Sequence, residues 1–159
     1  TLENCIGKLL TQHGKTISTA ESCTGGLIAS MLTSVPGSSQ YYLGSVVSYA
    51  NSVKEGVLGV PAEIIEEFGA VSSECVGAMA EGVRKLTGSD YSVATSGIAG
   101  PGGGSDEKPV GTVWIGVSSH MGTETFRMVF KGDRKRNIDR FAANALNLLR
   151  KKIKKELNY

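Results

Sequence analysis

The order of helix-like and strand-like segments is the strongest constraint on how this chain can fold. Helices are predicted where apolar residues recur every three or four positions, and strands where β-branched and aromatic residues gather. The segments follow one another as a helix over 2–13, a strand over 15–20, a helix over 27–32, a strand over 41–49, short helices from Asn51 or Ser52 and from Pro61, a helix from Ser72 or Ser73 to 87, strands over 91–96, 110–119 and 124–131, and a helix over 133–157. This order predicts an α/β fold, a three-layer α/β/α sandwich around a mixed, mostly parallel sheet with one late antiparallel hairpin.

The length of the chain is that of one ordinary domain. Neither an internal repeat nor a linker interrupts its 159 residues, so we expect a single domain over 1–159. The chain begins with Thr1 instead of Met, which leaves open a domain that precedes this sequence.

Charge and cysteine content narrow the class of partner. The net charge of +2 is too small to indicate a nucleic-acid partner, and no apolar run approaches the roughly 20 residues of a membrane span. The basic run over 150–155 is expected to be a solvated last helical turn. The three cysteines form no CxxC pair, and an odd number does not suggest a disulfide framework, so a reducing compartment is favoured. We therefore expect a cytoplasmic protein with no nucleic-acid or membrane partner, and a homo-oligomer stays open.

Glycine is the unusual feature of the composition. The chain has 21 glycines, and glycine is favoured where the backbone takes a positive φ or approaches a ligand closely. In α/β sheets ligands bind at the carboxyl ends of strands, where three loops are predicted, over 21–26, 49–54 and 97–109. These three loops could share one pocket.

Ser22 is the candidate nucleophile, because it follows a predicted strand and precedes a predicted helix. Its hydroxyl would lie beside the free N–H groups at a helix start, which stabilise developing negative charge. We expect the oxyanion donors among the N–H groups of Cys23, Thr24 and Gly25. The alternative is that Ser22 or Thr24 only caps the helix. Cys23 is the weaker nucleophile, because no histidine is placed to be its partner.

Lys54 is the candidate base. His13 and His120 both lie away from the three ligand loops, which leaves a lysine or a carboxylate. Lys54 lies five residues after Tyr49 at a strand-to-helix junction, and a buried lysine can lose its proton at neutral pH. A Ser22/Lys54 pair with Tyr49 as relay would be chemically sufficient. The alternative is a solvated Lys54 and a Tyr49 that packs in the core.

The glycine-rich segment over 97–109 predicts a phosphate-binding loop. Successive N–H groups in such a turn can surround an anion, although a flexible surface loop is the alternative. Asp106 and Glu107 could serve a phosphoester hydrolase with a divalent ion, but they lack further ligand spacing, and we expect no metal. The candidate binding residues are Ser96, Gly97, Gly102, Gly103, Ser105, Lys108 and Arg134, the last because arginine binds phosphate through two nitrogen atoms.

Taken together, several segments resemble the CinA C-terminal family, also called PncC or nicotinamide-nucleotide amidase. They are T-A-E-S-C-T-G-G, S-Y-A-N-S-V-K, G-A-V-S, S-G-I-A-G-P-G-G-G-S-D-E-K-P-V-G-T-V and F-K-G-D-R. The resemblance spans nearly the whole chain and implies an α/β/α sandwich that deamidates nicotinamide mononucleotide to nicotinic acid mononucleotide and ammonia. It also implies a serine nucleophile, a lysine base and an assisting tyrosine, which fall on Ser22, Lys54 and Tyr49. Many family members carry an N-terminal domain that resembles molybdopterin-binding domains.

The resulting hypothesis is hydrolysis of an amide on a phosphorylated pyridine nucleotide. Neutral Lys54, oriented through Tyr49, would remove the Ser22 proton as the hydroxyl attacks the carboxamide. The glycine-rich loop and Arg134 would hold the phosphate, so that nicotinamide riboside would be a poor substrate. We expect no cofactor. The alternative from another class is a catalytically inactive nucleotide-binding regulatory module.

Overall fold

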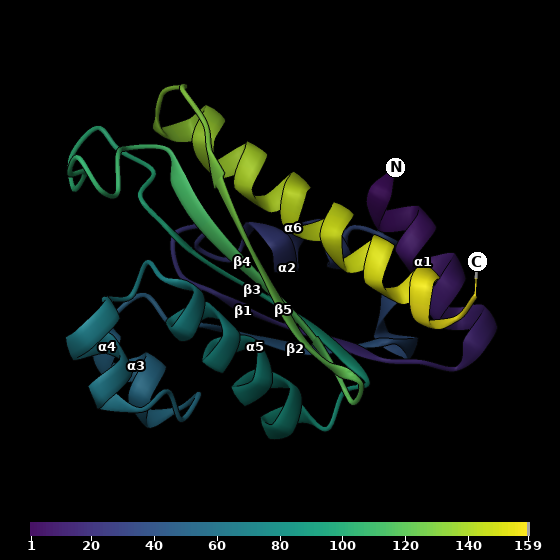
Figure 1. Ribbon diagram of the computed structural model, residues 1–159. Helices are drawn as coiled ribbons and strands as arrows, with labels where there is room; N and C mark the ends of the chain where they lie inside the picture. The colour runs from purple at the N-terminus through teal and green to yellow at the C-terminus, as the bar shows by residue number, and fades with distance from the viewer. Residues whose placement is uncertain (159) are drawn as a thin grey trace.

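The computed structural model describes residues 1–158 and has three layers (Figure 1). Its middle layer is a five-stranded sheet in the order β2-β1-β3-β4-β5. β1 pairs in parallel with β2 and β3, and β4 is antiparallel to β3 and β5. The predicted sandwich with a mixed sheet and a late hairpin is therefore confirmed. The strands are β1 (Ile17–Glu21), β2 (Tyr42–Val47), β3 (Tyr91–Gly97), β4 (Thr112–Ser119) and β5 (Gly122–Val129).

Helices cover both faces of the sheet. One face carries α1 (Leu2–His13), α2 (Leu27–Thr33) and α6 (Arg134–Glu156), and the other carries α3 (Asn51–Gly56), α4 (Ala62–Phe68) and α5 (Ser73–Thr87). A short 3-10 helix, η1 (Ser38–Gln40), precedes β2. Each face has its own apolar core. The larger core includes Ile6, Ile28, Phe141 and Leu149, and the smaller includes Val76, Met79 and Val83.

The helix starts show where the local prediction holds. Ser72 caps α5, because its hydroxyl accepts a hydrogen bond from the Cys75 N–H. Of the two predicted cap residues, Ser72 and Ser73, the first is therefore confirmed. The expectation that Asn51 or Ser52 caps α3 is wrong, because α3 already begins at Asn51, and the cap residue Ala50 offers no side-chain hydrogen bond.

The parallel strands bring the three predicted ligand loops to one edge of the sheet. Glu21 at the end of β1 pairs with Val47 at the end of β2 and with Thr95 near the end of β3. The segments that follow these three strands therefore leave the sheet at the same edge, as expected for an α/β fold.

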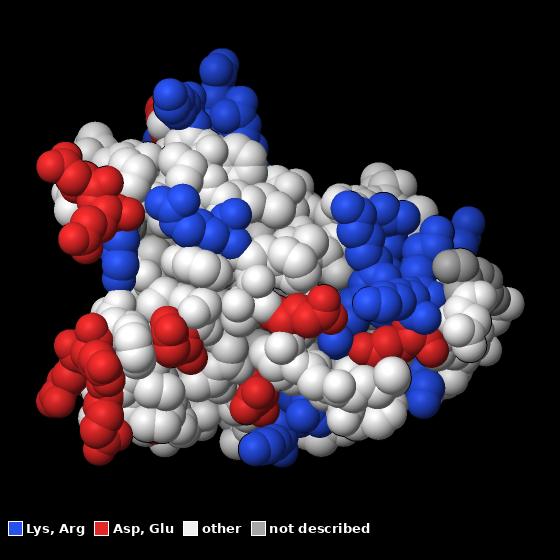
Figure 2. Space-filling model, viewed as in Figure 1, with Lys and Arg blue, Asp and Glu red and all other residues white. Residues whose placement is uncertain are grey.

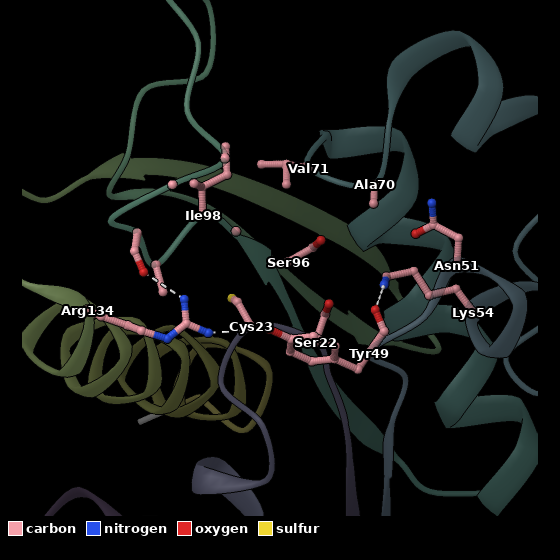
Figure 3. A pocket seen from close by; sticks show the side chains of 15 residues that line it. Ser22, Cys23, Tyr49, Asn51, Lys54, Ala70, Val71, Ser96, Ile98 and Arg134 are labelled. Carbon is pink, nitrogen blue, oxygen red and sulfur yellow. Dashed lines mark hydrogen bonds between the residues drawn. The ribbon is translucent and has the colours of Figure 1, made fainter.

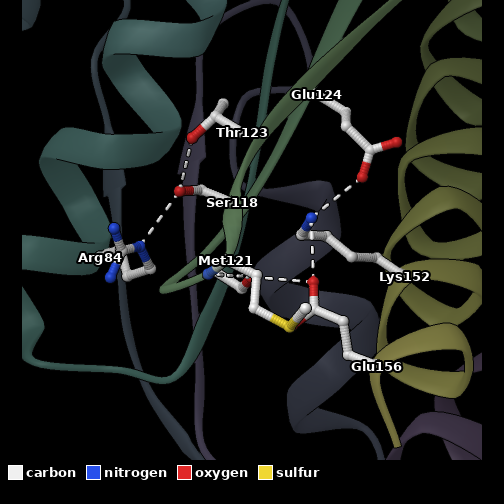
Figure 4. Close-up of polar contacts among 8 residues, drawn as sticks. Arg84, Ser118, Met121, Thr123, Glu124, Lys152 and Glu156 are labelled. Atoms are coloured by element: carbon white, nitrogen blue, oxygen red, sulfur yellow. Dashed lines mark hydrogen bonds and ion pairs between the residues drawn. The ribbon is translucent and has the colours of Figure 1, made fainter. Parts of the chain in front are cut away.

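The opposite end of the sheet is held to α6 by an ion-pair network around Lys152 (Figure 4). Lys152 contacts Glu124 of β5 at 3.0 Å and Glu156 at 3.0 Å, and its side chain is only 5% exposed. Ser119 at the end of β4 donates to Glu156 at 2.8 Å. The expectation that the whole run over 150–155 is solvated is wrong for Lys152, whose burial is offset by two carboxylates.

Surface charges form separate small groups on the face drawn in Figure 2. Basic side chains gather over the two ends of α6, and acidic ones over α4 and over the glycine-rich loop, whose sequence contains Asp106 and Glu107. None of the helices in the described part of the chain is long and apolar enough to cross a membrane.

Candidate active site

A cavity of about 280 Å³ lies at the edge where β1, β2 and β3 end (Figure 3). Its walls come from the turn after β1, the segment after β2, residues 70–71 before α5, the glycine-rich loop and the first residue of α6. The three predicted loops therefore share one pocket. Of the predicted site residues, those that line it are Ser22, Cys23, Tyr49, Lys54, Ser96, Gly97, Gly102, Gly103 and Arg134.

Ser22 lies in the turn between β1 and α2, and its side chain lines the cavity. The residue is 8% exposed, and its N–H donates to the Thr95 carbonyl at 3.1 Å. The hydroxyl makes no hydrogen bond with any of residues 1–158. The alternative that Ser22 is only a helix cap is therefore wrong, and its hydroxyl is free to meet a ligand.

The expectation that Ser22 lies beside free N–H groups of a helix is also wrong. Helix α2 begins only at Leu27, with Gly26 as its cap residue. The N–H groups of Gly26, Ile28 and Ala29 all donate to the Glu21 carboxylate, which fills the start of the helix.

The predicted oxyanion donors divide into available and occupied N–H groups. The Gly25 N–H donates to the Ser22 carbonyl at 3.1 Å and is unavailable, which corrects its predicted role. Within the described chain, the N–H groups of Cys23 and Thr24 donate to no oxygen atom. The Thr24 hydroxyl is buried against Glu21 at 2.7 Å, and neither Thr24 nor Gly25 lines the cavity, in contrast to their predicted place in the site.

Lys54 is almost completely buried, with 1% of the residue exposed. Its Nζ donates to the carbonyls of Ser48 at 2.8 Å and Tyr49 at 3.1 Å, and no carboxylate among residues 1–158 pairs with it. The expected alternative of a solvated lysine is wrong. Burial lowers the pKa of Lys54 below the usual 10.5, and the nearby thiols of Cys75 and Cys23 oppose this with smaller effects.

The hydrogen bonds of Lys54 suit a neutral amine. A neutral amine has two N–H groups and one lone pair, and two carbonyls already accept from this Nζ. The lone pair is thus left to accept a proton. In Figure 3 this nitrogen and the hydroxyl of Ser22 both point into the cavity.

Tyr49 lines the cavity with a side chain that is directed away from the predicted relay. The residue is 63% exposed, and its hydroxyl accepts from Arg134 Nη2 at 3.3 Å. Only its main-chain carbonyl contacts Lys54. The expectation that the phenol orients Lys54 is therefore wrong, as is the alternative of a core tyrosine.

Arg134 connects helix α6 to the glycine-rich loop. Its Nη1 donates to the Gly100 carbonyl at 2.7 Å, and the rest of the guanidinium faces the cavity beside Tyr49 (Figure 3). Gly103 has a φ of 90°, a left-handed conformation that favours glycine. A Cβ on Gly97 would lie 2.6 Å from the Thr112 carbonyl oxygen, so that position also needs glycine.

Ser105 lies outside the cavity, which corrects its predicted role in binding. Its hydroxyl accepts from the Lys108 N–H at 3.0 Å and closes a local turn. The Lys108 ammonium donates to the Phe68 carbonyl at 2.6 Å and likewise does not line the cavity. Ser96 does line it, and its buried hydroxyl has no hydrogen-bond partner in residues 1–158.

Sequence reasoning missed several wall residues. Asn51, Val71 and Ile98 line the cavity without having been proposed. Val71 belongs to the G-A-V-S segment, whose part in the family resemblance was the available signal. Among the described lining residues Lys54 and Arg134 are basic and none is acidic, so the permanent charge of Arg134 favours an anionic ligand.

Cys23 is a poor nucleophile despite its place in the cavity wall. Burial raises the pKa of its thiol to about 12, its own N–H acts in the opposite direction, and the Glu21 carboxylate raises the pKa further. The thiol is therefore neutral near pH 7, whereas a nucleophilic cysteine needs the thiolate.

Comparison with known proteins shows one family. A family model described as the CinA C-terminal domain matches residues 1–153. A CinA-like protein of Cytophaga hutchinsonii is 50% identical over 154 residues, which are 97% of this chain and 37% of that protein. A CinA-like protein of Desulforapulum autotrophicum is 53% identical, with 96% and 36% covered. The chain thus spans little more than a third of the length of these relatives.

Solved structures have the same fold. The competence damage-inducible protein A from Klebsiella pneumoniae has a TM-score of 0.92 at 38% identity, with 96% of this chain and 94% of that chain covered. A competence/damage inducible protein from Agrobacterium tumefaciens has a TM-score of 0.91 at 40% identity, with 93% and 91% covered.

The raised pKa of Cys23 predicts selective alkylation. At pH 7 the buried Cys23 thiol stays protonated, so iodoacetamide is expected to modify exposed Cys5 and to leave Cys23 intact. Peptide mass spectrometry over a time course measures both sites in one sample. Modification of Cys23 as fast as Cys5 would contradict the prediction.

Proposed function

The chain belongs to the CinA C-terminal domain family, and from this premise we propose that it hydrolyses the carboxamide of nicotinamide mononucleotide to nicotinic acid mononucleotide and ammonia. One observation carries the proposal. The unbonded hydroxyl of Ser22 shares a cavity with Lys54, a buried lysine that donates to two main-chain carbonyls and pairs with no carboxylate among residues 1–158.

The first step is formation of an acyl-enzyme. The Lys54 amine accepts the Ser22 proton as the serine oxygen bonds to the carboxamide carbon. The N–H groups of Cys23 and Thr24 are the available donors for the oxyanion of the tetrahedral intermediate. When the intermediate collapses, the Lys54 ammonium gives its proton to the leaving nitrogen, which departs as ammonia.

The second step is hydrolysis of the ester. Water takes the place of ammonia, and Lys54 removes one of its protons as the oxygen attacks the ester carbon. Collapse then returns the proton to Ser22 and releases nicotinic acid mononucleotide, with Lys54 neutral again.

The phosphate is assigned to the side of the cavity formed by Arg134, Gly102 and Gly103. Two of the five guanidinium N–H donors of Arg134 serve Gly100 and Tyr49, which leaves others for phosphate oxygens. The exposed ring of Tyr49 offers its face to the cationic pyridinium, which is an assisting role that does not need the phenol near Lys54.

Ammonia release tests the reaction and the nucleophile together. With nicotinamide mononucleotide as substrate, we expect Ser22→Ala to lose on the order of 10⁴-fold in kcat, because the variant cannot form the acyl-enzyme. Cys23→Ala is the matched control at the neighbouring position and is expected to keep most of the activity. A coupled ammonia assay measures both variants.

Two results would reject parts of this proposal. Binding of the mononucleotide without ammonia release would favour the inactive nucleotide-binding module. Release that survives Ser22→Ala but not Cys23→Ala would make Cys23 the nucleophile.

The pH dependence tests Lys54 as the base. Lys54 acts only when neutral, so kcat/KM should rise with pH and level off above the lowered pKa of Lys54, with a midpoint below 10.5. Lys54→Arg keeps a positive charge that cannot be removed and should abolish activity over the whole range. A profile whose midpoint lies at or above pH 10.5 would be inconsistent with this role.

Substrate truncation tests Arg134. In Arg134→Ala we expect kcat/KM for the mononucleotide to fall by roughly 10- to 100-fold, as for the loss of a hydrogen-bonded charge contact. The value for nicotinamide riboside, which lacks the phosphate, should change little. Arg134→Lys is the matched control and should recover part of the preference. Equal losses for the two substrates would show that Arg134 only supports the cavity wall.

A further inference from the structure

We propose that Glu21 is a positioning residue of this site, whose carboxylate holds the turn that presents the Ser22 hydroxyl and the Cys23 and Thr24 N–H groups. The proposal deepens the proposed function, since it rests on Ser22 as the nucleophile. The Glu21 side chain does not line the cavity and acts only through the chain around it.

The Glu21 carboxylate is fully buried and satisfied by donors of one turn. Its Oε1 accepts from Thr24 Oγ1 at 2.7 Å, from the Gly26 N–H at 3.2 Å and from the Ile28 N–H at 2.9 Å. Its Oε2 accepts from the Ala29 N–H at 3.0 Å. No lysine or arginine within residues 1–158 pairs with it, so these four donors alone offset its burial.

These contacts connect the two ends of the turn over residues 22–25, which we call the nucleophile turn. The donors lie three to eight residues after Glu21, and residues 22–25 are therefore enclosed between the carboxylate and the helix start. Thr95 of β3 adds two contacts from the side, through its carbonyl to the Ser22 N–H and through its hydroxyl to Thr24 at 2.9 Å. Because Glu21 occupies the helix N–H groups, the N–H groups that remain for an oxyanion are those of the turn.

The main chain of Glu21 also connects the nucleophile to the base. Its carbonyl accepts from the N–H of Ser48 at 2.7 Å and from the Ser48 hydroxyl at 3.2 Å. The Ser48 carbonyl in turn accepts from Lys54 Nζ at 2.8 Å. A change in the position of Glu21 would therefore move both reacting groups.

The contacts require a carboxylate instead of an amide. In Glu21→Gln one end of the side chain becomes NH₂, which can only donate. If the NH₂ faces Ala29, two donors oppose each other at the 3.0 Å position; if it faces the other way, it opposes the N–H groups of Gly26 and Ile28. Either orientation disturbs the turn while the side-chain volume stays the same.

The first test compares Glu21→Gln with Asp90→Asn. Asp90 accepts from the N–H and the hydroxyl of Thr16 at 2.9 and 3.1 Å, at the opposite ends of β1 and β3, and so makes similar contacts far from the site. We expect Glu21→Gln to lower kcat for ammonia release roughly 100-fold with little change in KM. Asp90→Asn keeps an oxygen atom that can accept both bonds, so it should keep kcat and melt near the wild type, whereas Glu21→Gln should melt at lower temperature. Equal kcat values in the two variants would overturn the proposal.

The second test does not depend on the substrate. A fluorophosphonate reagent forms a bond between its phosphorus and Ser22 Oγ, expels fluoride and gives the serine proton to the base, with its P=O oxygen at the oxyanion donors. We expect Glu21→Gln to be labelled roughly 100-fold more slowly than the wild type at saturating reagent. Labelling at the wild-type rate would overturn the proposal. A wild type that is labelled but releases no ammonia would reject the amidase function alone.

A smaller change in the same contacts tests the proposal if Glu21→Gln does not fold. Thr24→Val removes the hydroxyl that donates to Glu21 and keeps the Thr24 N–H, whereas Thr24→Ser keeps both. We expect slower labelling of Ser22 in Thr24→Val and recovery in Thr24→Ser. Wild-type labelling in folded Thr24→Val would overturn the proposal.

Discussion

Parallel strands end at a common edge, and the pairing of β1 between β2 and β3 uses this geometry to build the site. Glu21 lies opposite Val47 and Thr95, so the ends of the three strands lie side by side, with about 5 Å between neighbours and about 10 Å between β2 and β3. The antiparallel hairpin of β4 and β5 widens the sheet at its other side and leaves this edge unchanged. The positions of Ser22 and Lys54, the candidate dyad, depend on this pairing register.

Two ionisable groups are buried on either side of the nucleophile turn, and each is satisfied without the other. Glu21 is surrounded by N–H and hydroxyl donors, and Lys54 donates to main-chain carbonyls. A direct ion pair between them would favour the ammonium form and oppose the lowering of the Lys54 pKa. Because the Glu21 carboxylate is satisfied without Lys54, no ion pair raises the pKa of Lys54, as the proposed role of a neutral base requires.

Periodicity predicted the layers, the hairpin and the shared pocket, because these depend on apolar pattern and on the rule that parallel strands end together. The errors lie where a contact joins distant residues. Nothing near Ser22 reveals that Glu21 reaches the N–H of Ala29. The phenol of Tyr49 is directed by Arg134, which lies 85 positions later. Lys152 lies in a basic run that is typical of a solvated helix end. It is nevertheless buried, because Glu156, one helical turn later, and Glu124 of β5 both pair with it.

Helix α6 contacts both ends of the sheet. Its 23 residues span about 34 Å, from Arg134 at the cavity to the Lys152 network beside the hairpin. A helix of this length transmits a displacement along its axis as a nearly rigid rod. Sliding by even half a turn would take Arg134 away from Gly100 and Tyr49 and would also separate Lys152 from Glu124. The cavity contacts of Arg134 and the ion pairs of Lys152 thus belong to one rigid element, and a displacement of α6 along its axis would disturb both together.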